Sequence, residues 1–226
     1  MSDSGKGESP QGDSGESLPR SGAVRYVIEP LSTRHAVASF RSGAAYLDWY
    51  LDTQARRLAA ADVSRTFVLV FADAPSDGNV PDGVPIIGYF TLEAGIMPTA
   101  FLELPEIQRH AIAELLPGAA AVADGSDPLA IALKELPVVY LACLARDRQY
   151  HGKGYGGALL VAALREAAEA ATHIGAAGIF LVATEEGARL YRDYGFVAFE
   201  DFPRKMFLPM PDVRAFCAAL PNVNTV

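Results

Sequence analysis

The chain has 226 residues, half of them apolar, and a formal net charge of −8. This length allows a sizeable buried core, and the acidity argues against wholesale nucleic-acid binding while leaving room for a local basic patch. Two cysteines, Cys143 and Cys217, are too few for a disulfide framework or a metal cluster, so we expect reduced thiols and no bound metal. No apolar run is long enough to cross a bilayer and the N-terminus lacks a secretory h-region, which predicts a cytoplasmic chain without membrane contact.

Composition divides the chain into a tail and one domain. Residues 1–22 are almost entirely Ser, Gly, Asp, Glu, Pro and Lys, and cannot bury enough surface to offset the entropy of ordering. We therefore expect a disordered tail over 1–22 and a single domain over 23–226. A loop insertion at 117–135 interrupts the domain, and its residues reveal no chemistry.

Strand and helix patterns alternate through the domain without an internal repeat, which is typical of the α/β (α+β) class. In a long predicted helix Leu160, Leu164, Ala167 and Ala171 fall on one face, and the apolar run before it fits a strand buried on both faces. The expected elements are a strand at 25–31, a helix at 44–61, a hairpin of strands at 66–72 and 86–92, a short helix at 105–116, a buried strand at 136–145, a helix at 156–171, a strand at 179–183, a short helix at 185–194, and strands at 196–199 and 205–208.

The sequence RDRQYHGKGYGGALL, residues 146–160, joins the buried strand to the long helix. Glycines at 152, 154 and 156 let the backbone approach a ligand closely, and the first N–H groups of the helix have no partner within it. Together with the helix dipole, these groups predict a site for a phosphate or pyrophosphate. Lys153 adds a mobile positive charge.

Other interpretations of the glycines fit less well. A tight turn without a ligand needs fewer glycines, and no Gly-Lys-Ser/Thr follows at the spacing of a Walker A loop. Gly152–Gly157 matches a GxGxxG dinucleotide fingerprint, but six polar residues, Arg146 to His151, separate it from the strand. The nearest candidate acid, Glu185, lies too far along the chain for that fingerprint.

Two motifs in order resemble those of the GNAT superfamily of acyl-CoA-dependent N-acetyltransferases. Gln149-x-x-Gly152-x-Gly154 is similar to its acyl-CoA signature, Q/R-x-x-G-x-G/A, and the segment 188–196 resembles its A-x-x-(F/L)-Y-x-x-x-G-F motif. One helix and one strand separate the two motifs, as in the family. The resemblance implies a GNAT fold, in which a mixed central sheet is splayed at a β-bulge, flanked by helices, and holds acetyl-CoA in the splay.

The resemblance also assigns a cofactor site. The strand backbone through Arg146 would pair with the pantetheine arm of acetyl-CoA, while Gln149 and the amides of 152–157 would hold the pyrophosphate. His151 lies in the same loop, although a lone loop histidine is more often a bystander. The implied cofactor-binding residues are Leu144, Ala145, Arg146, Gln149, His151, Gly152, Lys153, Gly154, Tyr155, Gly156 and Gly157.

The implied chemistry is direct attack of a neutral amine on the thioester, without a covalent enzyme intermediate. Tyr191 stands at the family's tyrosine position and would protonate the departing CoA thiolate, the alternative being a packing role on its short helix. Glu93, at the end of the 86–92 strand, is the candidate general base. The alternative is that Glu93 is a solvated strand-end carboxylate without a catalytic role. In such enzymes water or the substrate's own ionisation can supply the proton acceptor instead.

Within the superfamily the chain looks most like the toxin branch, which acetylates the amino group of aminoacyl-tRNA and is neutralised by a ribbon-helix-helix antitoxin. The likeness covers most of residues 24–210. It rests on the early LDWYLDTQA helix, the strand entry at 64–68, the strand at 87–92, the strand ending in Leu-Ala-Cys-Leu-Ala and the closing Lys205-Met206-Phe207. Branch members commonly carry arginine at the position of Cys143 and a small aliphatic residue at that of Arg146. They also tend to be basic and to lack the 117–135 loop.

Three functions therefore remain open at the level of sequence. The first is acetylation of aminoacyl-tRNA by a toxin. The second is acetylation of a small cationic amine or a protein amine, which suits the acidic balance of the chain. The third is a non-enzymatic module that binds acyl-CoA or a partner protein. A homodimer through strand edges near the C-terminus is compatible with each of them.

Overall fold

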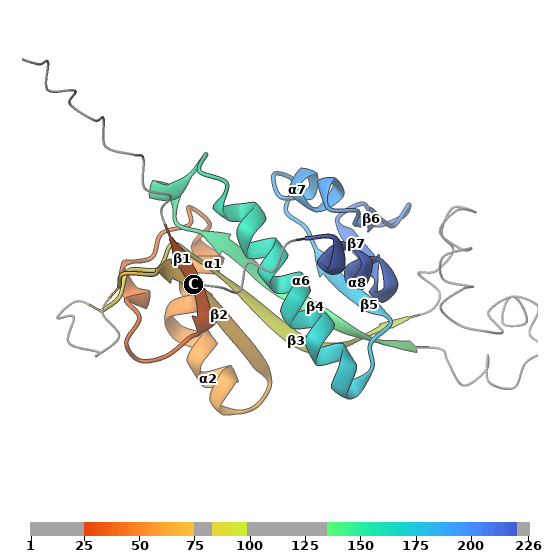
Figure 1. The fold of residues 1–226 in the computed structure, drawn as a ribbon, viewed down its shortest axis with the longest axis horizontal. Coiled ribbons are helices and arrows are strands. Elements are labelled where there is room, and N and C mark those ends of the chain that lie inside the picture. The colour runs from red at the N-terminus through yellow and green to blue at the C-terminus, as the bar shows by residue number, and fades with distance from the viewer. Residues whose placement is uncertain (1–24, 75–82, 99–134, 221–226) are drawn as a thin grey trace, which may run out of the picture.

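The computed structural model describes residues 25–74, 83–98 and 135–220 (Figure 1). They form a mixed seven-stranded sheet in the order β1-β2-β3-β4-β5-β7-β6. The strands are β1 (Tyr26–Pro30), β2 (Ser64–Phe71), β3 (Gly88–Pro98), β4 (Glu135–Arg146), β5 (Gly178–Val182), β6 (Val197–Ala198) and β7 (Lys205–Pro209). The helices are α1 (Ala45–Trp49), α2 (Ala55–Ala60), α6 (Tyr155–Ile174), α7 (Ala188–Asp193) and α8 (Met210–Ala219), with the short turns η1 (Val37–Ser39), η2 (Tyr50–Gln54) and η4 (Arg148–Tyr150).

The pairing of the strands explains the mixed character of the sheet. Strands β1 to β4 are antiparallel neighbours, β4 and β5 are parallel, and β7 pairs antiparallel with both β5 and β6. The parallel pair is joined by the crossover helix α6, as a parallel connection requires. This arrangement confirms the predicted fold class.

A β-bulge interrupts the pairing of β3 with β4. Thr91 lies opposite Cys143, but the next pair is Leu92 with Leu141, so Ala142 is the extra residue. A bulge of this kind bends the strand and disrupts the ladder locally. The sequence resemblance predicted a bulge, and the register places it in the middle of β4.

Strands β4 and β5 part at the bulge. Their described pairs are Val139 with Ile179 and Tyr140 with Phe180. Beyond Tyr140, β4 continues along β3 to Arg146, whereas β5 continues along β7 to Val182. The splay therefore opens between the second half of β4 and the end of β5.

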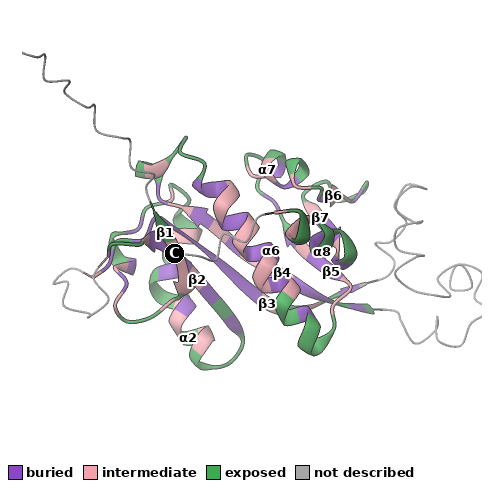
Figure 2. Cartoon of the chain, in the orientation of Figure 1, coloured by how far each residue is buried: buried purple, intermediate pink, exposed green. Residues whose placement is uncertain are grey.

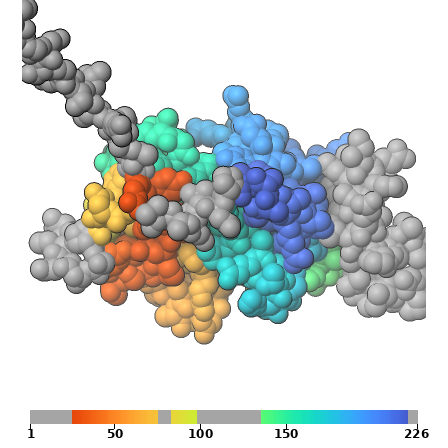
Figure 3. Space-filling model, viewed as in Figure 1, coloured from red at the N-terminus to blue at the C-terminus, as the bar shows by residue number. Residues whose placement is uncertain are grey.

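Helices cover both faces of the sheet. Leu69 and Phe90 point to the face where α6 and α8 pack, and Val68 and Tyr89 point to the face covered by the α1–η2–α2 segment. This alternation follows from the period of two along a strand. The space-filling view shows α8 directly against α6 (Figure 3), and burial decreases along α6 toward its C-terminal end, which is exposed (Figure 2).

Three sequence expectations differ from the structure. Strand β3 runs to Pro98 rather than ending near residue 92. Helix α8 was not expected, because Pro211 obscured its start, although proline is well tolerated in the first turn of a helix. Glu135, assigned to the loop insertion, belongs to β4. The predicted tail at 1–22, the helix at 105–116 and the rest of the insertion lie outside the described residues.

No helix in the described ranges is both long and apolar enough to cross a membrane.

Candidate active site

The splay leaves one edge of β4 open beside the glycine loop. Leu144 and Arg146 pair with β3 on one side only, opposite Phe90 and Gly88. On the other side, the described part of the chain provides no strand partner beyond Tyr140. An extended ligand can therefore hydrogen-bond to the backbone of β4 in the gap, as an added strand does.

The glycine loop follows at the end of this open edge. Gly152 and Gly154 have φ angles of +75° and +81°, in the left-handed region that glycine adopts without strain. Gly154 caps α6, a helix of 20 residues, and its carbonyl accepts from the amides of Gly157 and Ala158. The amides of residues 155 and 156 have no acceptor within the helix, and the dipole of α6 makes this end positive. The loop is thus built to receive an anion.

Side chains pack close to two further glycines, and at Gly157 the packing leaves no room for a side chain. A β-carbon on Gly157 would lie 2.5 Å from the Tyr194 hydroxyl, so any side chain there would displace that ring. A β-carbon on Gly156 would lie 3.4 Å from Nη1 of Arg146, which places this guanidinium group against the first turn of α6. Arg146 thus brings a half-buried positive charge to the predicted pyrophosphate site.

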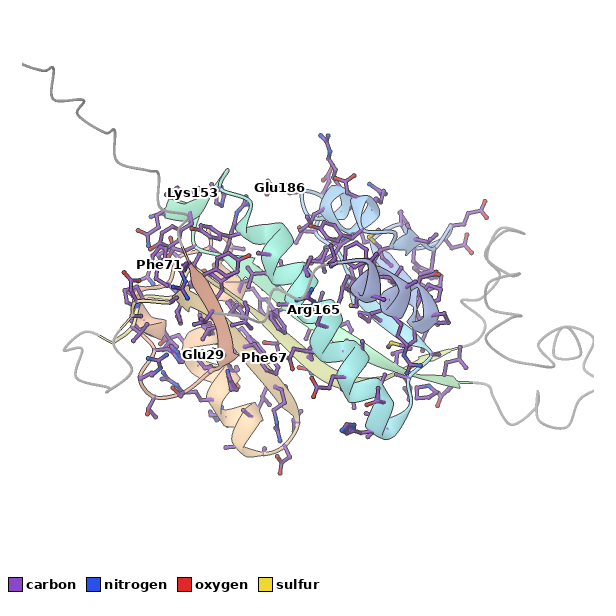
Figure 4. All side chains as sticks on the ribbon, viewed as in Figure 1. Glu29, Phe67, Phe71, Lys153, Arg165 and Glu186 are labelled. Atoms are coloured by element: carbon purple, nitrogen blue, oxygen red, sulfur yellow. The ribbon has the colours of Figure 1, made fainter. Side chains whose placement is uncertain are left out.

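The other predicted loop residues fall into two groups. Gln149, His151 and Lys153 are exposed, and Lys153 lies 5.4 Å from the Tyr150 ring centroid at the N-terminal end of α6 (Figure 4). Tyr155 is buried, and its ring packs edge-on against Tyr150. Tyr155 can contribute its backbone amide to a ligand, while its side chain belongs to the core.

Tyr191 lies on α7 and is 9% exposed. Its ring packs edge-on against Phe196 at a centroid distance of 5.7 Å. Burial, together with a smaller contribution from Cys143, raises the pKa of the Tyr191 phenol to about 12. The phenol is therefore protonated at neutral pH and lies within electrostatic range of the bulge in β4.

Glu93 occupies a different position from the expected one. It lies inside β3 rather than at its end, paired with Ser64 of β2 and with Tyr140 of β4. The strand continues past Gly95, where β4 approaches closely, since a β-carbon there would lie 3.3 Å from Tyr140 Cβ. Glu93 is therefore beside the bulge and not a solvated strand-end carboxylate.

Tyr50, Tyr140 and Cys143 lie within electrostatic range of this carboxylate. Burial raises the pKa of the Glu93 carboxyl, and the Glu93 charge contributes to the raised pKa values of Tyr50, Tyr140 and Cys143. Tyr50 reaches the site from the η2 turn, with its hydroxyl 3.5 Å from Ser64 Oγ. A half-buried carboxylate with a raised pKa can accept a proton from an ammonium group near neutral pH.

Sequence reasoning missed three residues of the site. Tyr50 and Tyr140 were placed only in a helix and a strand, and the one signal is that the Tyr140 phenol interrupts an otherwise apolar run. Asp147 is buried at the start of the glycine loop, where an acidic residue directly after an apolar strand is unusual. Within the described ranges, His, Cys, Asp and Glu form no group of three that could hold a metal ion.

Comparisons with known proteins identify relatives of the chain. No protein-family model matches the chain. The chain is 29% identical over 207 residues to a probable toxin TacT of Sinorhizobium fredii (strain NBRC 101917 / NGR234), which covers 88% of this chain and 98% of the relative. It is 30% identical over 186 residues to a tRNA-acetylating toxin of Mycobacterium tuberculosis (strain ATCC 25618 / H37Rv), which covers 82% of this chain and 92% of that toxin.

The fold has a solved counterpart in AtaT complexed with acetyl-methionyl-tRNAfMet. The TM-score is 0.64 at 22% identity, covering 84% of this chain and 98% of AtaT. The sequence relationship to the tRNA-acetylating toxin spans most of both chains, and the bulge, splay and glycine loop occur in the order that the GNAT motifs predict. The chain belongs to the toxin branch of the GNAT acetyltransferases.

Proposed function

We propose that this enzyme transfers an acetyl group from acetyl-CoA to the α-amino group of an aminoacyl-tRNA. The observation that carries the proposal is the splay of β4 from β5, with the glycine loop at one end, Glu93 beside the bulge, and Tyr191 within electrostatic range of Cys143 at the bulge. In this arrangement a thioester in the splay would have a proton donor and a proton acceptor nearby. Relatives that acetylate tRNA supply the acceptor class.

The donor would bind mainly to backbone. The open edge from Leu144 to Arg146 would pair with the amide groups of the pantetheine arm. The pyrophosphate would lie on the amides of 152–157, beside the Arg146 guanidinium and within reach of the mobile Lys153 and the exposed side chains of Gln149 and His151. AtaT has been solved with acetyl-CoA, which supports this donor.

The reaction would proceed by direct attack. A neutral amine adds to the thioester carbonyl, so a C–N bond forms and a tetrahedral intermediate carries the former carbonyl oxygen as an oxyanion. The C–S bond then breaks and CoA leaves as its thiolate. The amine loses one proton to an acceptor in the site, and the leaving thiolate needs a hydrogen-bond donor there while the C–S bond breaks. The thiolate takes its own proton from solvent after CoA has left.

Tyr191 would be the donor. A phenol with a pKa of about 12 is a weaker acid than a thiol of about 8.5, so its contribution is a hydrogen bond to the sulfur while the C–S bond breaks. The raised pKa also means that Tyr191 stays protonated through the neutral range. AtaT and KacT have both been solved as tyrosine-to-phenylalanine mutants, which supports a central role for a tyrosine in these toxins.

Glu93 would accept the proton from the attacking amine, directly or through one water molecule. Its carboxyl has a raised pKa because it is partly buried, which makes it a stronger base than an exposed glutamate. Tyr50 and Tyr140 would line the path by which the amine approaches.

Thiol release from acetyl-CoA would test the proposal, with mixed aminoacyl-tRNA and a panel of free amines as acceptors. We expect turnover with charged tRNA, none with deacylated tRNA, and an acetylated amino acid after hydrolysis of the product. Turnover on free polyamines or lysine, with none on charged tRNA, would instead establish a small-amine or protein-amine acetyltransferase. Acetyl-CoA binding without any turnover would show a non-enzymatic module.

Partners are part of the same proposal. AtaT has been solved with the C-terminus of its antitoxin AtaR, and we propose that an antitoxin of the ribbon-helix-helix class neutralises this cytoplasmic enzyme. A homodimer is also proposed. Co-expression with the product of an adjacent gene, followed by purification and light scattering, would reveal both the antitoxin complex and the number of copies.

A further inference from the structure

Asp147 is a buried carboxylate to which the chemistry above gives no role. It is the first residue after β4 and is 5% exposed. Its Oδ1 accepts from the backbone amide of Gln149 at 3.0 Å, and its Oδ2 accepts from the amide of Arg41 at 2.9 Å. One side chain thus joins the glycine loop to a segment more than a hundred residues earlier in the chain.

The backbone around Asp147 is fixed as well. Its amide donates to Ile87 O at 2.8 Å, and its carbonyl accepts from Tyr150 at 3.0 Å. The amide of Arg148 donates to Arg41 O at 2.9 Å, so Arg41 is held on both its N–H and its C=O. Asp147 therefore lies where β3, the Arg41 segment and the η4 turn meet.

A charged side chain is needed at this position. Burying a carboxylate is costly unless it is hydrogen-bonded, and both oxygens here accept from backbone amides. Within the described ranges no ion pair involves Asp147. An asparagine of the same size would offer one oxygen to one amide and turn its NH₂ group toward the other, leaving a donor facing a donor.

We propose that Asp147 is a positioning residue of the donor site. By holding the Gln149 amide it caps the η4 turn, and this turn sets where the chain enters the left-handed glycines at 152 and 154. The loop amides then face the pyrophosphate before acetyl-CoA arrives. The inference rests on the proposed binding of acetyl-CoA at this loop.

This role has a selective consequence. Asp147 acts on the part of the site that receives the pyrophosphate and not on the open edge of β4 or on Tyr191. Its loss should weaken donors that carry a pyrophosphate and spare acetyl-pantetheine, which has the same thioester and pantetheine arm without the nucleotide. A residue needed only for folding would affect both donors alike.

The experiment compares wild type, Asp147→Asn and Asp147→Ala in the full chain. Calorimetry measures the binding of acetyl-CoA and of acetyl-pantetheine, and thiol release with aminoacyl-tRNA gives kcat/KM for both donors. We expect Asp147→Ala to weaken acetyl-CoA binding by about tenfold or more, since a hydrogen bond to a charged group contributes about tenfold or more in affinity. For acetyl-pantetheine we expect kcat/KM to change by less than about twofold, and Asp147→Asn should lie between wild type and Asp147→Ala.

Asp48→Ala is the matched control. Asp48 Oδ1 accepts from the amide of Ser42 at 2.7 Å, so it anchors the same segment as Asp147 does but makes no contact with the glycine loop. It should leave acetyl-CoA affinity within about twofold of wild type, because the hydrogen bonds of the loop stay intact.

Equal losses with both donors, or no loss with either, would overturn the positioning role. If Asp147→Ala does not fold, the volume-conserving Asp147→Asn carries the same comparison. A wild type that binds acetyl-CoA but does not acetylate aminoacyl-tRNA would overturn the acceptor assignment alone. The calorimetric arm would still decide the role of Asp147, because it needs no acceptor.

Discussion

The two sides of the splay are built by different means. The proposed donor side, from Leu144 to Gly157, is a continuous stretch of chain whose proposed binding groups are mostly backbone amides and carbonyls. The acceptor side gathers single side chains from four elements, with Tyr50 on η2, Glu93 on β3, Tyr140 on β4 and Tyr191 on α7. A ligand common to a whole superfamily can be held by backbone, whereas a ligand that differs between members must be selected by side chains.

This difference predicts that mutations separate into two classes. Changes on the acceptor side should lower kcat and leave acetyl-CoA affinity intact. Changes in the glycine loop should weaken acetyl-CoA binding and leave the chemical step little altered once the donor is saturating. A mutation that lowers both kcat and acetyl-CoA affinity would show where the two sides are coupled.

Tyr191→Phe should have the largest effect. Removing a hydrogen-bond donor to the charge that develops in a transition state costs about 10²–10³-fold in kcat, so we expect kcat to fall by about a hundredfold or more. The ring is kept, so acetyl-CoA affinity should stay within about twofold, measured by calorimetry beside thiol-release kinetics. Tyr194→Phe is the control on the same short segment and should leave kcat nearly unchanged. A loss below about threefold in Tyr191→Phe would remove the phenol from the mechanism.

Gly154→Glu should have the next largest effect, on binding. The left-handed φ of +81° costs a non-glycine residue about 1–2 kcal/mol, and the new carboxylate would repel the pyrophosphate. We expect acetyl-CoA affinity to fall by about a hundredfold, equivalent to about 2.7 kcal/mol.

Gly175→Glu is a close control for that substitution. Gly175 follows the other end of α6 with a φ of +72°, and a β-carbon at either glycine meets nothing within 4 Å. It therefore brings the same charge without a nearby anion site. Its backbone strain is at least as large, since its ψ of 133° lies outside the left-handed helical region in which Gly154 sits at ψ −4°. Equal losses of acetyl-CoA affinity in the two variants would show that strain, and not the phosphate site, explains Gly154→Glu.

Glu93→Gln should reduce kcat by about tenfold or more and change its pH dependence. Because burial raises the pKa of the Glu93 carboxyl, the wild type should lose activity as the pH falls through this raised value, above the usual range for glutamate. The variant has no group to protonate there, so this limb of the pH–rate profile should disappear. A limb that persists in Glu93→Gln would assign the base to water or to the amine itself.

The same carboxyl makes a prediction for stability with the opposite sign. Its folded-state pKa lies above its unfolded value, so its contribution to stability is full at low pH and is lost as the pH rises through the folded pKa. Glu93→Gln should therefore raise the Tm at neutral pH relative to wild type. The difference should shrink as the pH is lowered and both side chains become neutral. A Tm gain that does not depend on pH would point to packing instead.

The donor side could be predicted from the sequence because its constraint is local. The apolar strand, the glycine loop and the helix follow one another directly in the sequence, so their pattern can be recognised without knowing the fold. Gly152 and Gly154 have the positive φ angles that the motif requires. The apolar face of α6 was likewise correct, since Leu160, Leu164 and Ala167 are fully buried. The role of these residues in binding acetyl-CoA stays a prediction.

The acceptor side could not be predicted to the same extent, because it depends on register. Nothing near Glu93 in the sequence shows that it pairs with Tyr140, since that pairing is set by a bulge between strands separated by nearly forty residues. Helix α8 was missed for a local reason, the proline at its start. Asp147 was missed because its partner, the Arg41 amide, lies 106 positions away.

Cys143→Ala should have the smallest effect, although the residue lies at the bulge between the two sides. A thiol at this point raises the alternative of an acetyl-cysteine intermediate, in which Cys143 would attack the thioester and then pass the acetyl group to the amine. Burial raises the pKa of the Cys143 thiol to about 12, so roughly one molecule in 10⁵ carries the thiolate at pH 7. Direct attack by the amine avoids this barrier.

We therefore expect Cys143→Ala to keep kcat/KM within about threefold of wild type. Cys217→Ala on α8 is the control, since its thiol lies outside the splay, and it should have an equally small effect. Mass spectrometry of the wild type incubated with acetyl-CoA alone should show no acetyl adduct on Cys143. A loss above about a hundredfold together with such an adduct would replace direct attack by a two-step mechanism. In that case the bulge would supply the nucleophile, and the donor and acceptor sides would meet at one catalytic side chain instead of at a backbone opening.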